Sequence, residues 1–515
     1  YRRCRRVLMF HRFEELGAEP CLVRATEFDY ADLDYGVPRT ASEELAHPGS
    51  TRVRSLVRSI THTAFTRDAQ QPALVRNGVP HQVYLRKRLP ALEFEYSAAR
   101  IADDVLTLAP GSLENLPVGL DATNYQWIDL DGEGLTGVLV AEDAGWHYKR
   151  NLGDGRFGPQ ETLRLVPSTP ARGGGEARFL DLAGDGRLDV AALAGSIAGF
   201  YERTADEAWE PFRPFAQLPA IPWDDPNLRF VDVNGDGHAD VLISEDNIFT
   251  WYPSLGEAGF GPARRVRQAA EEEAGPHLVF ADGTESIYLA DMSGDGLNDI
   301  VRIRSGEVCY WPNLGYGRFG PKVTMDRAPQ LDDGRRFDQR RVRLADIDGS
   351  GTTDLIYLGR DGVRLYFNHS GNGWTDARAL AFPPVDNLAS VHVLDLMGNG
   401  TACLVWSSPM TVDRQSRIKY VDLMGGVKPH LLVRMTNNLG AETSLAYAAS
   451  TKFYAADRLA GRPWITRIPF PVHVVERRET DDRVSGSRFI TPYPYHHGYF
   501  DGIARQFRGF RLVGQ

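Results

Sequence analysis

Six copies of one short Asp/Gly-rich segment recur along this 515-residue chain, and this repeat constrains the fold more than any other feature. Their leading aspartates are spaced by 52, 51, 59, 55 and 49 residues, and they are Asp129, Asp181, Asp232, Asp291, Asp346 and Asp395. A regular period is the signature of an architecture in which each copy forms one supersecondary unit. The chain is therefore expected to contain six similar units.

Each repeat has the pattern of a short series of β-strands. An apolar pair enters the Asp/Gly loop, an apolar run leaves it, and an aromatic strand follows, as at Trp146, Trp251 and Trp311. Gly, Pro and Asn turns separate these runs and leave no room in the repeats for ten-residue amphipathic helices. The fold class is predicted to be all-β.

A period of about fifty residues is that of one four-stranded propeller blade, and six blades in a ring leave few exposed sheet edges. A linear solenoid is the alternative, although solenoid periods are usually shorter. The phrase LLVRMTNNLG, ending at Gly440, repeats the turn at other blade ends and is interpreted as the last strand of blade six. The prediction is a six-bladed β-propeller at 117–440, between β-rich segments at 1–116 and 441–515. The chain is expected to be a piece of a longer protein.

The repeat loops follow the template Asp-x-[Asp/Asn/Ser]-Gly-[Asp/Ser]-Gly-x-x-Asp, which surrounds one centre with oxygen atoms. It resembles the front of an EF-hand loop without the bidentate Glu at position 12, so any calcium affinity is expected to be weak, on the order of 10⁻⁴–10⁻³ M. The alternative is that these side chains only cap turns by accepting backbone N–H bonds. The candidate calcium ligands are Asp232, Asn234, Asp236 and Asp240 in blade three, Asp291, Ser293, Asp295 and Asp299 in blade four, and Asp346, Asp348, Ser350 and Asp354 in blade five.

Composition narrows the classes of partner. The net charge of −10 comes from sixteen acidic residues in the repeat loops, and without them the rest of the chain would carry +6. The sequence has no basic stripe with interleaved aromatic residues, so nucleic acid is a poor candidate partner. No run approaches the ~18 apolar residues of a membrane helix, so direct membrane insertion is not expected. The cysteines lack a CxxC pair and are expected to be free buried thiols, with a Cys4–Cys21 disulfide as the alternative in an exported protein.

Catalytic motifs are absent from the sequence. Glu93 and Glu95 have an E-x-E spacing, but they alternate along a strand and are expected to lie on its wet face. His496 and His497, near Asp501, would point to opposite faces of a strand and make a poor chelating pair. The chain also lacks GxSxG, HExxH and a phosphate-binding loop. An enzyme is therefore not expected within this chain.

The Asp/Gly loops with Phe-Gly-Pro closures resemble FG-GAP/VCBS propeller repeats. A sharper resemblance comes from the phrases NLPVGLDATNYQWIDLDGEG, YWPNLGYGRFGP, LADIDGSGTTDLIYLGRDGVRLYFNHSGNGW, TKFYAADRLAGRPWITRIPFPVHVVE and YHHGYFDGIARQFRGF. These phrases are similar to the middle region of the B component of bacterial insecticidal Tc toxins, the TcdB/TcaC family, which is related to SpvB.

This resemblance implies a function for each part of the chain. The flanking segments would be Rhs-type β-shell, which with a C-type subunit encloses a toxic segment, and the propeller would dock on an A-type channel subunit and gate toxin release. Such a complex is secreted, and its effector enzyme lies elsewhere. Two alternatives remain: an exported calcium-dependent adhesion or lectin-like propeller module, and an SpvB-type enzyme whose transferase domain lies beyond residue 515.

Overall fold

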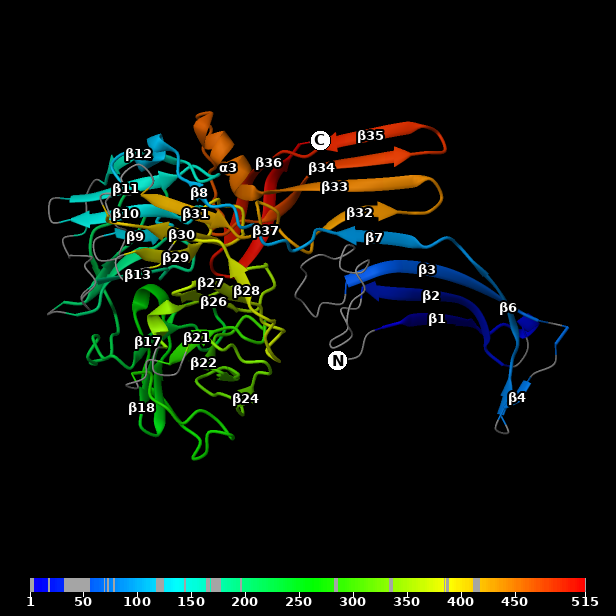
Figure 1. The fold of residues 1–515 in the computed structure, drawn as a ribbon, viewed down its shortest axis with the longest axis horizontal. Helices are drawn as coiled ribbons and strands as arrows, with labels where there is room; N and C mark the ends of the chain where they lie inside the picture. The colour runs from blue at the N-terminus through cyan, green and yellow to red at the C-terminus, as the bar shows by residue number, and fades with distance from the viewer. Residues whose placement is uncertain are drawn as a thin grey trace.

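A computed structural model describes most of the chain. The described residues are 4–16, 19–31, 56–68, 70–71, 74–76, 79–116, 125–142, 145–163, 167, 177–194, 197–281, 286–332, 337–383, 385, 389–410 and 417–514. They form a ring of β-sheets beside an extended curved β-sheet (Figure 1). No helix among them is long and apolar enough to cross a membrane.

Six four-stranded antiparallel sheets form the ring, which confirms the predicted all-β, six-bladed propeller. Blades one and two consist of β9 (Tyr125–Ile128), β10 (Gly137–Glu142), β11 (Gly145–Asn151), β12 (Phe157–Thr162), β13 (Ala177–Leu180), β14 (Asp189–Ala192), β15 (Gly199–Tyr201) and β16 (Arg213–Pro214). Blades three and four consist of β17 (Leu228–Val231), β18 (Asp240–Glu245), β19 (Ile248–Tyr252), β20 (Arg264–Arg267), β21 (Ile287–Ala290), β22 (Asp299–Arg304), β23 (Glu307–Trp311) and β24 (Val323–Thr324).

Blade five follows the same order, and blade six takes its fourth strand from before the propeller. Their strands are β25 (Val342–Ala345), β26 (Asp354–Gly359), β27 (Gly362–Tyr366), β28 (Arg378–Leu380), β29 (Ser390–Leu394), β30 (Cys403–Ser407), β31 (Ile418–Asp422) and β8 (Leu106–Thr107). The second and third strands are the central strands of each blade, and the neighbouring blades cover both faces of that blade. Their side chains are therefore buried on both faces, as all six residues of β26 are. This burial explains their continuous apolar runs.

Hydrogen bonds that recur from seam to seam close the ring. Asn368 Nδ2 of blade five donates to Met292 O of blade four at 2.9 Å. The equivalent bond joins Asn151 Nδ2 of blade one to Leu396 O of blade six at 2.8 Å. A linear solenoid would leave the first and last repeats far apart, so this contact excludes the solenoid alternative.

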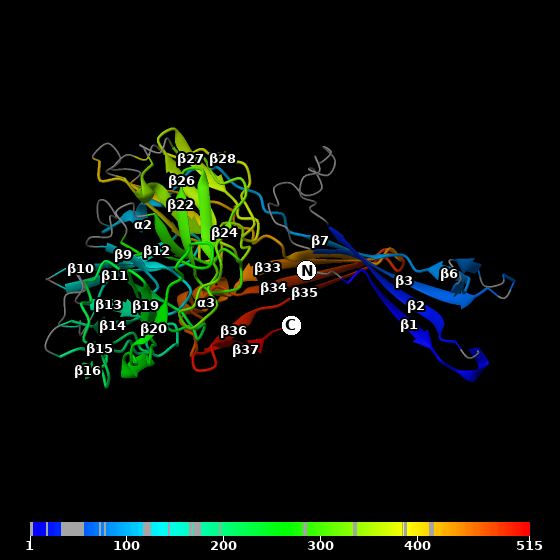
Figure 2. The same cartoon turned by 90° about the horizontal axis from the view of Figure 1, so that it is seen from below.

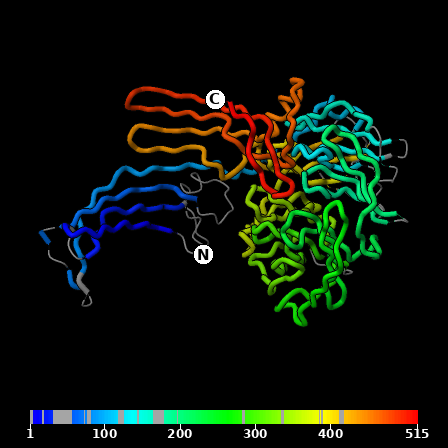
Figure 3. The backbone as a smooth tube through the Cα atoms, turned by 180° about the vertical axis from the view of Figure 1, so that it is seen from behind, coloured from blue at the N-terminus to red at the C-terminus, as the bar shows by residue number. Residues whose placement is uncertain are grey.

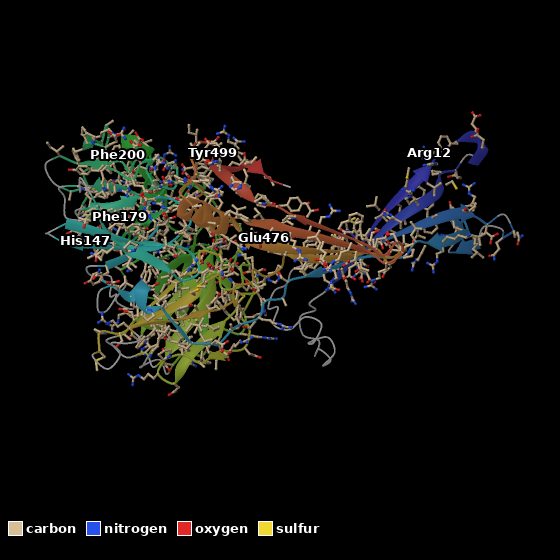
Figure 4. The ribbon with its side chains drawn as sticks, turned by 90° about the horizontal axis from the view of Figure 1, so that it is seen from above. Arg12, His147, Phe179, Phe200, Glu476 and Tyr499 are labelled. Carbon is tan, nitrogen blue, oxygen red and sulfur yellow. The ribbon has the colours of Figure 1, made fainter. Side chains whose placement is uncertain are left out.

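The second part of the molecule is a nine-stranded sheet that extends away from the propeller (Figures 2 and 3). Its strands, in spatial order, are β1 (Arg6–His11), β2 (Cys21–Ala31), β3 (Leu56–Arg67), β7 (Leu92–Tyr96), β32 (Leu432–Thr436), β33 (Ala441–Ala449), β34 (His473–Asp482) and β35 (Ser487–Pro492), with β6 (Tyr84–Arg88) paired to β3. Figure 4 shows Arg12 at the far end of this part and Phe179 and Phe200 in the propeller.

Smaller elements complete the described fold. Two hairpins pair β4 (Leu74–Arg76) with β5 (Val79–His81), and β36 (Tyr495–Asp501) with β37 (Gln506–Val513). The helical elements are α2 (Pro110–Leu113), α3 (Ser450–Leu459), η1 (Glu14–Leu16), η2 (Gly256–Ala258) and η3 (Gln339–Arg341).

The interpretation of 431–440 as the last strand of blade six is wrong. β32 pairs with β7 in the nine-stranded sheet, where Met435 lies opposite Phe94, while β8 supplies the fourth strand of blade six. The propeller is thus inserted between two adjacent antiparallel strands, and a strand from before the first blade completes the last one. The predicted start at residue 117 lies outside the described residues, but the predicted 1–116 flanking segment is wrong in one respect, because it contains β8 of blade six. The β-rich 441–515 segment also contains α3, which strand patterning did not predict.

Candidate functional site

The leading aspartate holds each of the six repeat loops in shape. In every blade its Oδ2 accepts the backbone N–H of the glycine five residues later, at 2.6–3.0 Å. These glycines have positive φ, for example +81° at Gly237 and +82° at Gly351, a conformation in which a Cβ would be strained. The repeated Asp and Gly therefore encode one turn geometry, as the turn-capping alternative expects.

The aspartate at position 9 joins two strands of its blade. Asp240 is 0% exposed, and its carboxylate accepts Val233 N at 3.2 Å and Ser254 N at 2.7 Å. Asp189, Asp299 and Asp354 accept the equivalent pairs of N–H groups in blades two, four and five. Burial raises the pKa of Asp240 and of Asp299 to about 6, and that of Asp189 to about 7.

Of the three predicted calcium loops, blade five gathers its carboxylates most tightly. Oxygens of Asp346, Asp348 and Asp354 lie within 4.8 Å of one another, and Asp348 and Asp354 are each 1% exposed. Basic side chains from the segment after blade six also lie near this loop. His430 Nε2 is 3.9 Å from Asp348 Oδ2, and Lys428 contributes a positive charge that opposes the burial-driven rise in the pKa of Asp346.

The predicted ligands of blades three and four are arranged differently. In blade three, Asn234 Nδ2 donates to Asp236 Oδ2 at 2.8 Å, and Asp236 Oδ1 accepts His238 N at 2.9 Å. In blade four, Asp295 Oδ1 accepts Leu297 N at 2.9 Å, and Ser293 lies in the same loop. Within the described ranges, only the blade-five loop forms a cluster of three carboxylates.

The segment after the propeller packs against the face that carries the Asp/Gly loops. Arg505, in the turn between β36 and β37, donates to Gly184 O at 3.1 Å and to Gly237 O at 2.7 Å, and so contacts blades two and three. Thr451 of α3 donates to Gly398 O of blade six. The loops therefore attach the propeller to the flanking sheet and hairpin.

A buried ionic cluster strengthens this attachment at blades one and two. Arg150 pairs with Asp131 at 2.9 Å, with Glu207 at 2.8 Å and with Glu133, and Asp131 and Glu133 have side chains that are 0% exposed. Arg203 also pairs with Asp131 at 2.9 Å. Burial opposes ionisation of Asp131, but the charges of Arg203, Arg150 and Arg467 outweigh it and lower the pKa of Asp131.

Two members of this ionic cluster come from beyond the propeller. Arg458 of α3 reaches Glu133 at 3.3 Å and Glu207 at 2.9 Å, and Arg467 reaches Glu207 at 3.2 Å. Sequence reasoning missed this cluster because the residues that join the propeller to the flanking segment in it lie more than 250 residues apart. The one local signal was Glu133 at loop position 5, where the template has Asp or Ser.

The residues considered for catalysis do not form one site. Glu93 and Glu95 are exposed on β7, as their alternation predicts. His496 Nδ1 lies 2.5 Å from Asp457 Oδ2, whereas His497 Nδ1 accepts Ile465 N at 3.2 Å. All four cysteines are free thiols, and Cys4 is exposed, which differs from the expectation that it is buried.

Comparison with known proteins agrees with this architecture. The family model of the insecticide toxin TcdB middle/N-terminal region matches residues 381–515, and the FG-GAP-like repeat model matches 232–302 and 346–406. No curated protein matches the chain.

Solved structures extend the likeness over nearly the whole chain. A chain of the Photorhabdus luminescens Tc holotoxin pore has 27% identity and a TM-score of 0.80, with 99% of this chain and 22% of that chain covered. The TcdB2-TccC3 crystal structure has 26% identity and a TM-score of 0.62, with 99% and 23% covered. This chain thus spans less than a quarter of the length of those chains. In its sequence motifs and in its fold, this chain matches the middle region of a Tc toxin B component with FG-GAP-type propeller repeats.

Proposed function

We propose that this chain is a non-enzymatic part of a secreted bacterial Tc-type toxin complex, in which its propeller docks on an A-type channel subunit and gates release of a toxin held with a C-type subunit. The observation that supports this most is the likeness to the holotoxin pore chain, which covers 99% of this chain and therefore both propeller and flanking sheet. The likeness to the TcdB2-TccC3 structure supports a C-type partner.

The way the propeller is attached fits a gate. Both of its connections leave from the paired strands β7 and β32, and the ionic cluster and Arg505 hold it against the flanking segment. A ring held in this way can change the spacing between its blades while the face that carries the Asp/Gly loops stays attached to the flanking segment. Docking would then favour the open form only by binding it more tightly than the closed form.

A disulfide across one seam tests gating separately from docking. Asp154 N of blade one donates to Met397 O of blade six at 3.1 Å, so the paired substitutions Asp154→Cys and Met397→Cys would join the first blade to the last. The oxidised full-length protein should still bind the A-type subunit but should no longer deliver the toxin, and reductant should restore delivery. The single Asp154→Cys variant is the matched control.

Each outcome of this experiment is informative. Toxin delivery by the fully oxidised double variant would refute gating by opening of this seam. Failure of the wild-type protein to bind an A-type subunit would refute the docking proposal as well.

We also propose that the blade-five loop binds calcium, because Asp346, Asp348 and Asp354 place three carboxylate oxygens within 4.8 Å. Like charges this close repel unless a cation or backbone N–H groups compensate them. Millimolar calcium should raise the thermal midpoint relative to chelator, and Asp348→Asn should abolish that rise while Asp236→Asn in blade three should not. An equal midpoint in calcium and in chelator would refute calcium binding.

A further inference from the structure

One position of the first strand in every blade carries polar side chains at the hub of the ring. It lies three residues before the leading aspartate and pairs with a buried residue of the second strand, as Arg343 pairs with Ile356 in blade five. The first strands of blades five and six, β25 and β29, contact each other, which places these strands at the centre. The six residues at this position are Gln126, Arg178, Arg229, Tyr288, Arg343 and His392.

Side chains at this hub position reach across the seam to the next blade. The Arg178 guanidinium lies 4.9 Å from the centroid of the Phe230 ring. Arg343 Nε donates to Val391 O of the following first strand at 2.9 Å. The hub is therefore lined by cationic groups that lie between adjacent blades.

Two of these arginines bond to carbonyls and form no ion pair with the described residues. Arg343 Nη1 donates to Arg340 O at 2.6 Å and to Val342 O at 2.9 Å. Arg229 Nη1 likewise donates to Pro226 O and to Leu228 O. Burial lowers the pKa of both guanidinium groups. Asp225 provides a negative charge near Arg229, whereas no carboxylate is among the groups that act on Arg343. A partly buried charge without a counter-charge is costly, and an anionic ligand near Arg343 would relieve that cost.

One of these arginines, Arg343, lines a cavity. A cavity of about 340 Å³ opens between blades five and six, where Arg341, Arg343 and His392 form part of its wall. Arg341 Nη1 donates to Leu358 O at 2.7 Å and forms no ion pair among the described residues, although its charge helps to lower the pKa of Asp338. Asp338, also in the wall, is paired with Arg340 at 3.1 Å, so its charge is already compensated. Among the described lining residues, three arginines stand against one carboxylate, so their positive charge is in excess.

We propose that this cavity binds an oxyanion, a carboxylate or a phosphate group, held by Arg341 and Arg343. Guanidinium groups present paired N–H donors that match both anions and keep their charge at neutral pH. The same chemistry could come from a free phosphate or from acidic side chains of a peptide. The site is on the hub, away from the Asp/Gly loops, and the proposal does not depend on toxin gating.

Calorimetric titration of the full-length protein tests this site with two probes. Inorganic phosphate represents the free anion, and a tetraglutamate peptide represents carboxylates from a polypeptide. Arg343→Gln and Arg341→Gln should each weaken binding of the preferred probe by about tenfold or more, the usual effect of losing a charge-assisted hydrogen bond. Arg229→Gln is the matched control, because Arg229 occupies the same strand position in blade three but does not line this cavity.

The outcomes separate the two sources and can overturn the proposal. Binding of phosphate alone would assign a free anion, and binding of the peptide would assign a polypeptide carboxylate. The proposal is overturned if the wild-type protein binds neither probe, or if Arg343→Gln and Arg341→Gln bind as tightly as Arg229→Gln. Circular dichroism of each variant guards against loss of the fold, and Arg341→Gln adds a second variant whose side chain makes a single bond to the backbone.

Discussion

Asp240→Ala tests whether the position-9 aspartates hold the blades together. The carboxylate of Asp240 is fully buried and accepts two backbone N–H groups, from Val233 and from Ser254. An alanine would leave both donors without an acceptor, and each unsatisfied buried donor costs about 1–3 kcal/mol. Burial of the charged carboxylate is itself unfavourable, as its pKa of about 6 indicates, so removing the carboxylate offsets part of that loss. We expect a net destabilisation of about 2–4 kcal/mol at neutral pH.

Asp236→Ala is the matched control in the same loop. Asp236 is exposed, and it accepts one backbone N–H, from His238, and one amide hydrogen bond from Asn234. Substitutions at exposed sites usually change stability by less than about 0.5 kcal/mol. Both variants would be measured by urea denaturation with chelator present, which removes any contribution from bound calcium. Tryptophan fluorescence reports on this blade because Trp251 is 1% exposed.

The result that would refute the reasoning is equal stability of Asp240→Ala and Asp236→Ala in chelator. Such equality would mean that the two N–H groups find other acceptors, so the repeated aspartate would not be needed for the fold. A larger loss for Asp236→Ala that appears only with calcium would instead favour a metal at this loop.

Three further predictions concern the ionic cluster, pH and ring closure. Arg150→Met should destabilise the protein by about 3–5 kcal/mol in urea denaturation, because it leaves Asp131 and Glu133 buried without their shared partner; a shift below about 1 kcal/mol would contradict this. The pKa of Asp299 is raised in the folded state to about 6, so its stabilisation is present below the unfolded pKa of about 4 and is lost as pH rises through about 6. Wild type should therefore exceed Asp299→Asn in stability by more at pH about 4.5 than at pH about 7.5, and a constant difference would contradict the pKa shift. Leu108→Ala should lower the free energy of unfolding by about 2–5 kcal/mol and speed proteolysis of the propeller, because Leu108 is 2% exposed beside the closing strand β8. An unchanged cleavage rate would argue against closure of the ring by β8.

Much of the fold could be predicted from the repeat because its determinants are local. The Asp at loop position 1 accepts a hydrogen bond from the Gly at position 6, so the residues that form the turn are close neighbours in the sequence. The apolar runs after each loop predict strands buried between blades. The period then gives four strands per blade and six blades, and the Asn151–Leu396 contact closes the ring as expected.

The site was less predictable because its contacts connect distant parts of the chain. A carboxylate pattern such as Asp-x-Asp fits a metal ligand and an acceptor of backbone N–H groups equally well, and only the positions of Val233 and Ser254 show that Asp240 has the second role. Nothing near Glu133 in the sequence indicates Arg458, which pairs with it from α3.

The sequence by itself determined the repeating unit, its turn and its strands, because each depends on interactions within a few residues. The tertiary structure decided which strand completes blade six, that β32 belongs to the flanking sheet, and which charges meet in the ionic cluster and at the hub. β8 is only two residues long, so its pairing with β31 depends on the sheet edge that lies open beside it in the folded chain. That choice is a property of three-dimensional packing and of the long-range charges that accompany it.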